Sequence, residues 1–390
     1  MSATTAPPAE ALLERTRALV PMLRENALAT EQARRVLPEH FDALAEAGVF
    51  RMAAPKRFGG GEVSFQAQCD VLAEIASACP STSWVATIFS AMAWVAGVFP
   101  DEAQEEILAS GDPRICAALS PTGKLVPKDG GYVVSGKWPF NTGCHGARWT
   151  YLHGVAPKDD GEPVLRAFFV PTGELTILDD WDATGMTGTG SNTVVADEVF
   201  VPGHRTLLVA DVVEGNLPAR HNADNPYHQY PLAPVLIVNA AGTPLGTARG
   251  ALEAFLERLP GRPFTYTNYA LQSEAALTHL RVGESSLKID SAAAHVRLAC
   301  ALLDERPGPM TLDARIESRA HVGYSTGLAR EAVDALFAIS GASAIQTHVP
   351  IQRFQRDIQA LSNHAVMSPQ FNLELYGRWL CGLEPNTPIV

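Results

Sequence analysis

Aromatic and small polar residues gather in one short stretch of the chain. Residues 136–145 read GKWPFNTGCH, and Trp149 follows shortly after. Trp138 and Phe140 offer flat apolar faces. The hydrogen-bond donors of the stretch are Asn141, Thr142 and the peptide N–H groups that Gly143 is expected to leave free. A flavin ring needs this combination, a planar apolar wall with a few hydrogen bonds aimed at its N5 edge. The two aromatic residues would equally suit the core of a sheet, so residue types alone leave both interpretations open.

Other common chemical signatures are absent from the sequence. It contains no G-x-x-x-x-G-K-[ST], no G-x-S-x-G and no H-E-x-x-H. The glycine-rich run 185–190 (GMTGTG) precedes an expected strand rather than a helix, so it lacks the helix N-terminus that binds phosphate. Six scattered cysteines include no C-x-x-C pair. The sequence therefore predicts neither a metal site nor a disulfide framework.

Composition limits the classes of partner. The 390 residues carry 30 Lys+Arg against 42 Asp+Glu, a formal net charge of −12, with no basic cluster for a nucleic acid. The N-terminal residues lack the basic and apolar regions of a signal peptide. Residues 75–100 are uncharged, but prolines at 80 and 100 bracket the apolar part and DEAQEE follows it. We interpret 81–99 as a buried helix with Ser81 as N-cap, not as a membrane span. The sequence thus predicts a cytoplasmic protein.

Three blocks of different patterning follow one another. Apolar spacing predicts an N-terminal helical domain (1–112), a central antiparallel β domain (113–225) and a C-terminal four-helix bundle (226–390), an α+β fold. The expected helices span 10–25, 30–48, 64–77 and 81–99 in the first block, and 232–258, 270–304, 316–336 and 350–380 in the last. These elements must position the 136–149 cluster.

The order of blocks and four motifs resemble the acyl-CoA dehydrogenase fold over essentially the whole chain. The motifs are AEAGVFRMAAPKRFGGGE (45–62), VVSGKWPFNTGCHGARW (133–149), WDATGMTGTGSNTVVADEVFVP (181–202) and QRFQRDIQALSNH (352–364). Within that superfamily they look most like the two-component flavin-dependent monooxygenases. Those include hydroxyphenylacetate-type oxygenases, dibenzothiophene-type S-oxygenases and amino-sugar N-hydroxylases.

One position separates dehydrogenase from monooxygenase. A dehydrogenase of this fold needs a carboxylate base, commonly eight residues after the aspartate of an Arg-Asp pair. Counting from Asp357, that position is Ala365, and no acid occurs before Glu374. Beside it stands His364, where the monooxygenases resemble one another in having histidine. An isolated histidine is usually structural, but the surrounding motif favours a catalytic role for His364.

The resemblance implies a mechanism. Reduced flavin, FADH2 or FMNH2, would diffuse from a separate NAD(P)H-dependent flavin reductase and react with O2 to a C4a-hydroperoxide. The distal oxygen would then pass to a bulky aromatic or polycyclic small molecule. Asn141 or Thr142 would contact N5, and His364 would act as a base or hydrogen-bond the hydroperoxide. Trp138, Phe140 and Gly143 would line the ring.

Further contacts follow only from the resemblance. Arg262 and Gln272 resemble residues that reach the cofactor's diphosphate from a neighbouring subunit, and Gly341-Ala342 resembles the small-residue loop that closes on it. Contacts across subunits imply an oligomer, with a homotetramer as the family expectation. Trp84, Ile88, Met92 and His145 would form the substrate pocket. Relatives carry a second histidine on the helix matching 84–96, and this chain has none between His40 and His145.

Two alternatives remain at this point. An acyl-CoA dehydrogenase or related desaturase would hold oxidised FAD tightly and be bleached by an acyl thioester. A non-catalytic protein of the same fold would bind no flavin. The sequence names neither the substrate nor the atom that is oxidised, and it does not distinguish FAD from FMN.

Overall fold

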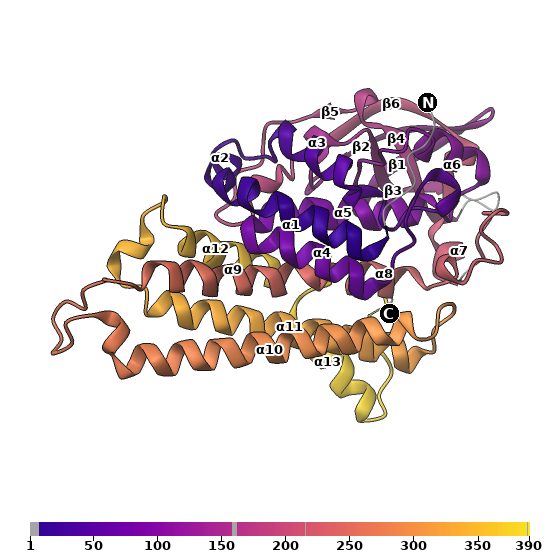
Figure 1. Ribbon diagram of the computed structural model, residues 1–390. Coiled ribbons are helices and arrows are strands. Elements are labelled where there is room, and N and C mark those ends of the chain that lie inside the picture. The colour runs from indigo at the N-terminus through magenta and orange to yellow at the C-terminus, as the bar shows by residue number, and fades with distance from the viewer. Residues whose placement is uncertain (1–7, 158–161, 215, 388) are drawn as a thin grey trace.

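The computed structural model describes residues 8–157, 162–214, 216–387 and 389–390 (Figure 1). The first block forms helices α1 (Ala9–Glu25), α2 (Ala27–Gln32), α3 (Pro38–Ala47), α4 (Phe65–Ala78), α5 (Pro80–Ala96) and α6 (Asp101–Leu108). The predicted helix 30–48 is therefore two helices. Pro38 explains the break, because a residue that precedes proline disfavours helical dihedrals while proline itself suits the first helical turn.

The central block is a seven-stranded sheet ordered β5-β6-β2-β1-β3-β4-β7. The strands are β1 (Ile115–Lys128), β2 (Gly131–Trp138), β3 (Trp149–Pro157), β4 (Pro163–Pro171), β5 (Thr176–Ile177), β6 (Val194–Pro202) and β7 (Thr206–Leu208). The expectation of an antiparallel sheet is wrong in one respect, because β1 and β3 pair in parallel. Both β2 and β3 flank β1, so the connection 139–148 crosses the end of β1. That connection contains the aromatic and polar cluster.

The central block ends with the short helix α7 (Val209–Glu214). The last block contains α8 (Leu232–Ala240), α9 (Gly242–Arg258), α10 (Ala276–Asp304), α11 (Leu312–Ala338), α12 (Pro350–Ser362) and α13 (Pro369–Leu380). Two predicted helices are each divided in the structure. The segment 232–258 breaks at Ala241, near Pro244, and the segment 350–380 breaks at 363–368, before Pro369. The second break creates the turn that carries His364.

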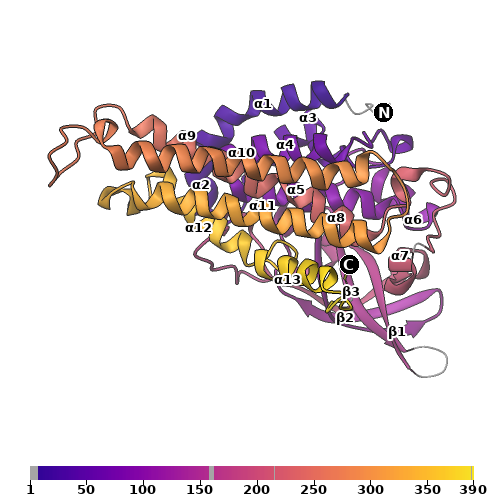
Figure 2. The ribbon, with the colours of Figure 1, turned by 90° about the horizontal axis from the view of Figure 1, so that it is seen from below.

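Helix α5 lies at the centre of the molecule. It packs on β1 on one side and on α4, α8 and α9 on others, and Figure 2 shows the sheet and α1 on opposite sides of the helical layers. This position explains why α5 is apolar all round. No helix in the described part of the chain is long and apolar enough to cross a membrane. The predicted N-cap is wrong: α5 begins at Pro80, its N-cap position is Cys79, and Ser81 lies inside the helix.

Candidate functional site

The connection 139–148 carries four of the predicted cofactor residues, and main-chain hydrogen bonds join it to the loop 185–192. Asn141 N–H donates to the oxygen of Asn192 (3.1 Å), and Gly143 N–H donates to the oxygen of Thr189 (3.0 Å). The expectation that these peptide N–H groups are free is therefore wrong. They fasten the connection 139–148 to the loop 185–192, which makes the two loops one structural unit.

A chain of hydroxyl groups continues through this unit. Thr142 Oγ1 lies 2.9 Å from Ser191 Oγ, which lies 2.7 Å from Thr189 Oγ1. Thr189 Oγ1 donates to the main-chain oxygen of Met186 (2.8 Å). All three hydroxyl residues are buried. Their chain ties Thr142, a predicted N5 contact, to the backbone at Met186.

The loop 185–192 is in turn fastened to α12. Met186 N–H donates to Asp357 Oδ1 (2.5 Å), and Arg356 donates to the main-chain oxygen of Thr184. A Cβ at Gly185 would lie 2.2 Å from the main-chain oxygen of Arg356, so only glycine permits this approach. Burial raises the pKa of Asp357 to about 7, although the Met186 N–H and the charges of Arg353 and Arg356 oppose that shift.

His364 follows α12, in the turn before α13. Its ring meets the ring of Trp84 edge to face, with 5.1 Å between centroids and an interplanar angle of 68°. His364 is exposed to solvent, yet desolvation by the surrounding protein lowers its pKa. The Val366 N–H donates to Nδ1 across 3.4 Å, an assignment that leaves the proton of the neutral ring on Nε2.

The wall beside His364 is one face of α5. Trp84, Ile88 and Met92 recur at every fourth residue and so share that face. Ile88 is the one residue of α5 that is not buried, whereas Trp84 and Met92 are 6% and 2% exposed. The stretch 84–96, where relatives were expected to carry a histidine, has none in this chain, so His364 is the ionisable side chain among these four residues.

The residues around Asn141 fit a flavin ring in their chemistry. The amide oxygen and nitrogen of Asn141 are both buried without a hydrogen-bond partner, an arrangement that costs about 1–3 kcal/mol per group. The N5–H and C4=O edge of a reduced flavin supplies one donor and one acceptor, which matches that amide. Phe140 is 70% exposed at φ +60° and meets Trp181 edge to face at 5.9 Å. This exposed aromatic pair suits the apolar side of the ring.

Two predicted site residues have surroundings that differ from the prediction. Trp138 is fully buried in the sheet, and its Nε1–H donates to the main-chain oxygen of His153 (2.8 Å), which is the position of a core residue. His145 lies in a pocket of about 320 Å³ with Arg34 and Arg35, and Nε2 contacts Asn192 Oδ1 (3.1 Å). None of the α5 wall residues lines that pocket.

The loops that follow α9 and α11 lie at the end of the bundle away from β1 and β3 (Figures 1 and 2). They contain Arg262, Gln272, Gly341 and Ala342. Arg262 donates to the main-chain oxygen of Ser340, and Gln272 Nε2–H donates to that of Ile339 (2.6 Å). Gly341 adopts φ +67°, and a Cβ there would lie 2.8 Å from the Arg262 guanidinium. Arg258, which the sequence analysis missed, donates to Ser343 Oγ in the same cluster. Within one chain these residues do not join the loops at 141 and 186.

Only one group of possible metal ligands is compact among the described residues. Side-chain atoms of Glu102, Glu106 and His204 lie within 4.8 Å of one another on the surface. Arg205 forms an ion pair with Glu106 and so already neutralises part of that charge.

The sequence analysis also missed Met186, Ser191 and the contact made by Asp357. The glycine-rich run 185–190 was considered only as a phosphate loop, and Asp357 only as a reference point for counting. The sequence did contain features that could have indicated this contact. Gly185 lies in the motif 181–202, and the Arg356-Asp357 pair lies in the motif 352–364. The link between them spans 171 residues of sequence.

Comparisons with known proteins identify the family of the chain. The family descriptions "Acyl-CoA dehydrogenase, N-terminal domain" and "Acyl-CoA dehydrogenase, C-terminal domain" match residues 9–109 and 238–369. The oxygenase component of the FADH(2)-dependent resorcinol hydroxylase of Rhizobium sp. (strain MTP-10005) is 33% identical over 391 residues, covering 96% of this chain and 95% of the relative.

Two solved structures are similar over nearly the whole chain. The 3-HSA hydroxylase from Rhodococcus sp. RHA1 has a TM-score of 0.89 and 33% identity, covering 97% of this chain and 99% of its own. XiaF from Streptomyces sp., in complex with FADH2 and glycerol, has a TM-score of 0.90 and 27% identity, covering 98% of each chain. The chain therefore belongs to the oxygenase components of the flavin-dependent hydroxylases, monooxygenases built on the acyl-CoA dehydrogenase fold.

Proposed function

We propose that this chain hydroxylates a bulky aromatic small molecule with O2 and reduced flavin. In the balanced reaction, the substrate C–H, O2 and FADH2 or FMNH2 give the hydroxylated product, water and oxidised flavin. The main support for this proposal is the position of His364, whose ring contacts the ring of Trp84 on α5. The next residue is Ala365, at the position where a dehydrogenase of this fold would commonly carry its carboxylate base.

Each residue of the site has a distinct part in this proposal. The flavin supplies the two electrons and the site of O2 activation when it is bound. Asn141 would hold the N5 edge of the ring, Thr142 would be fixed beside it by Ser191, and Phe140 with Trp181 would cover an apolar edge. His364, neutral near pH 7, would hold a proton at Nε2 next to the reacting oxygen.

The substrate is expected to be large and mostly apolar. The α5 wall offers the indole of Trp84 and the side chains of Ile88 and Met92, without an ionisable group. A phenol that needs two bases for activation fits this wall less well than a polycyclic aromatic compound. The resorcinol hydroxylase similarity supports an aromatic substrate.

A reductase partner and an oligomer complete the proposal. Relatives are named as oxygenase components, so we expect a separate NAD(P)H-dependent flavin reductase to deliver the reduced flavin by diffusion. Helix α10 exposes a stripe of leucines at 277, 280, 287 and 298, and Leu280 is 71% exposed. Exposed leucines repeated along one helix suit an interface between subunits. A homotetramer would cover it and would bring the Arg258 and Arg262 cluster of one subunit towards another subunit's flavin.

We also place this protein in the cytoplasm. Five of its six cysteines are buried as free thiols and Cys381 is exposed as one, which suits a reducing compartment. Secretion of the protein through an oxidising compartment would contradict this placement.

The experiment supplies the purified protein with reduced FAD or FMN under anaerobic conditions, then ¹⁸O2 and a panel of polycyclic phenols. Incorporation of one ¹⁸O atom into product, detected by mass spectrometry, is the expected result. A dehydrogenase would instead hold oxidised FAD on purification and lose its visible absorbance when an acyl thioester is added. That second outcome would overturn the proposal, and failure to bind either flavin would indicate a non-catalytic protein. Light scattering on the same sample tests the tetramer.

A further inference from the structure

A second pocket lies at the other end of α5. It has a volume of about 370 Å³ and is formed by Val98, the segment 217–231 and residues that flank the α10–α11 connection. Val98 is fourteen residues beyond Trp84 in the sequence, which is about 20 Å along a helix axis. None of the residues that meet at His364 lines it. The pocket is therefore separate from the proposed flavin site.

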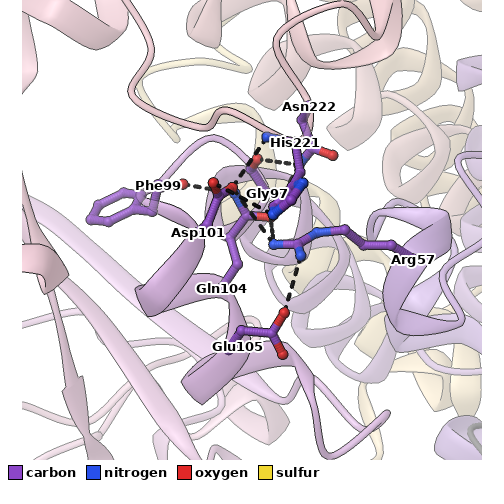
Figure 3. A network of polar contacts seen from close by, with 8 residues as sticks. All are labelled: Arg57, Gly97, Phe99, Asp101, Gln104, Glu105, His221 and Asn222. Atoms are coloured by element: carbon purple, nitrogen blue, oxygen red, sulfur yellow. Dashed lines mark hydrogen bonds and ion pairs between the residues drawn. The ribbon is translucent and has the colours of Figure 1, made fainter.

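A polar network holds one wall of this pocket in place (Figure 3). The Asn222 amide donates to the main-chain oxygen of Gly97 (2.7 Å) and to Gln104 Oε1 (3.1 Å). Arg57 donates to Gln104 Oε1 (3.0 Å) and to Glu105 (3.0 Å), and the His221 N–H donates to Asp101 (3.3 Å). The segment around Asn222 is thus fastened to the end of α5 and to α6, so the wall is built before any ligand arrives.

The polar groups inside the pocket have unused hydrogen-bonding capacity. His228 is 1% exposed, and neither of its ring nitrogens has a hydrogen-bond partner. Its Nε2 lies beside Gly97, 3.0 Å from where a Cβ would stand, and His228 is one of the residues that line the pocket. Arg315 donates through Nε to the main-chain oxygen of Met310 (3.2 Å), and it forms no ion pair with any described residue. The guanidinium Nη groups therefore remain available.

The charge of the pocket contrasts with that of the chain. The chain carries a net charge of −12, yet no aspartate or glutamate is among the pocket-lining side chains that the structure describes. Burial lowers the pKa of His228 to about 4, so this ring is neutral near pH 7 and offers one donor and one acceptor. Leu217, Pro231 and Pro309 supply apolar walls. A cation, a neutral imidazole and apolar walls together suit an organic anion.

We propose that this pocket binds a small aromatic carboxylate that carries a hydroxyl group. The carboxylate would pair with the Arg315 guanidinium, whose fork of N–H groups matches its two oxygens. The hydroxyl, which both donates and accepts, would satisfy His228, and the ring would lie between the apolar walls. A volume of about 370 Å³ accommodates one such ring with its substituents. The inference does not rest on the proposed hydroxylation, because no residue is shared between the two sites.

Isothermal titration of 4-hydroxybenzoate into the purified, flavin-free full-length protein tests the proposal. We expect saturable binding that weakens at least about tenfold in Arg315→Gln, the loss that follows removal of a charge-assisted pair. Arg306→Gln removes an exposed charge from the same connection and should bind like the unaltered protein. The neutral amide, 4-hydroxybenzamide, should also bind at least about tenfold more weakly than the acid.

Two further variants keep the test decisive. Leu217→Trp fills the pocket without removing a hydrogen bond, so it should abolish binding even if Arg315→Gln does not fold. His364→Ala alters the other site and should leave the affinity unchanged. The proposal is overturned by equal binding of acid and amide, by unchanged affinity in Arg315→Gln or Leu217→Trp, by loss of binding in His364→Ala, or by no saturable binding at millimolar acid.

Discussion

The amide N–H of Met186 donates to Oδ1 of Asp357 across 2.5 Å, and this bond joins the loop that supports Thr142 to the helix that precedes His364. Beyond Met186 the chain of hydroxyls runs through Thr189 and Ser191 to Thr142. Thr142 and His364, two of the three predicted catalytic residues, are thus joined by one continuous set of contacts through Asp357.

Replacing Asp357 tests this connection. In Asp357→Ala the buried Met186 N–H loses its acceptor, so we expect a loss of about 1–3 kcal/mol in the free energy of unfolding. Asp357→Asn keeps an oxygen acceptor at Oδ1 and should retain most of the stability. Urea unfolding followed by circular dichroism measures both variants. Equal destabilisation of the two would show that the charge of Asp357, rather than its hydrogen bond, matters.

The same carboxyl predicts a pH dependence. Its pKa in the folded protein is about 7, above the ordinary 3.8, so folding favours the protonated form. The stability that this group contributes is fully present below about pH 4 and is lost as the pH rises through 7. Relative to Asp357→Asn, the unaltered protein should therefore become less stable between about pH 4 and pH 7. Parallel pH profiles of the two urea midpoints would contradict the assignment.

Gly185 tests the approach of the loop to α12. A methyl group in Gly185→Ala would lie 2.2 Å from the main-chain oxygen of Arg356, so the loop must move away. We expect a loss of about 1–3 kcal/mol, as for other overpacked sites, together with weaker flavin binding. Gly173→Ala is the matched control, because no heavy atom lies within 4 Å of its added Cβ. If both variants unfold at the same urea concentration, the close approach is not a constraint.

Replacing His364 should reduce the fraction of flavin oxidation that yields hydroxylated product, with little effect on folding. Because its side chain is exposed in the turn after α12, His364→Ala should fold normally and bind flavin, but release more hydrogen peroxide per flavin oxidised. We expect coupled product to fall by about 10²-fold or more, the usual range for a lost acid–base group. His348→Ala, an exposed histidine in the α11–α12 connection, is the control. An unchanged ratio of product to peroxide would remove His364 from the mechanism.

Replacing Asn141 should weaken flavin binding without lowering the stability of the protein. Since its amide has no partner in the flavin-free protein, Asn141→Ala should leave the melting temperature unchanged or raise it. The same change should weaken reduced-flavin binding and increase peroxide release. Asn222→Ala provides the contrast, because that amide makes two hydrogen bonds and its loss should lower the melting temperature. A stability loss in Asn141→Ala without any change in flavin affinity would assign the residue to the fold alone.

The local patterning of the chain predicted most elements but not all of their ends. Apolar spacing located the helices now seen as α1, α4, α5, α10 and α11, because that spacing reports which faces are buried. It missed the breaks before Pro38 and Pro369 and assigned Ser81 a capping role. Helix ends depend on a few local dihedrals and hydrogen bonds, which average periodicity does not resolve.

The sequence by itself determined the three-block order, the buried character of α5, the absence of a dehydrogenase glutamate at Ala365 and the motifs that mark the family. Only the tertiary structure decided which of those motifs meet. It turned Trp138 into the sheet core, placed His145 beside Arg35, and brought Met186 to Asp357 across 171 residues. The physical reason is that periodicity reports whether a face is covered, whereas the identity of the covering group depends on how separate layers pack.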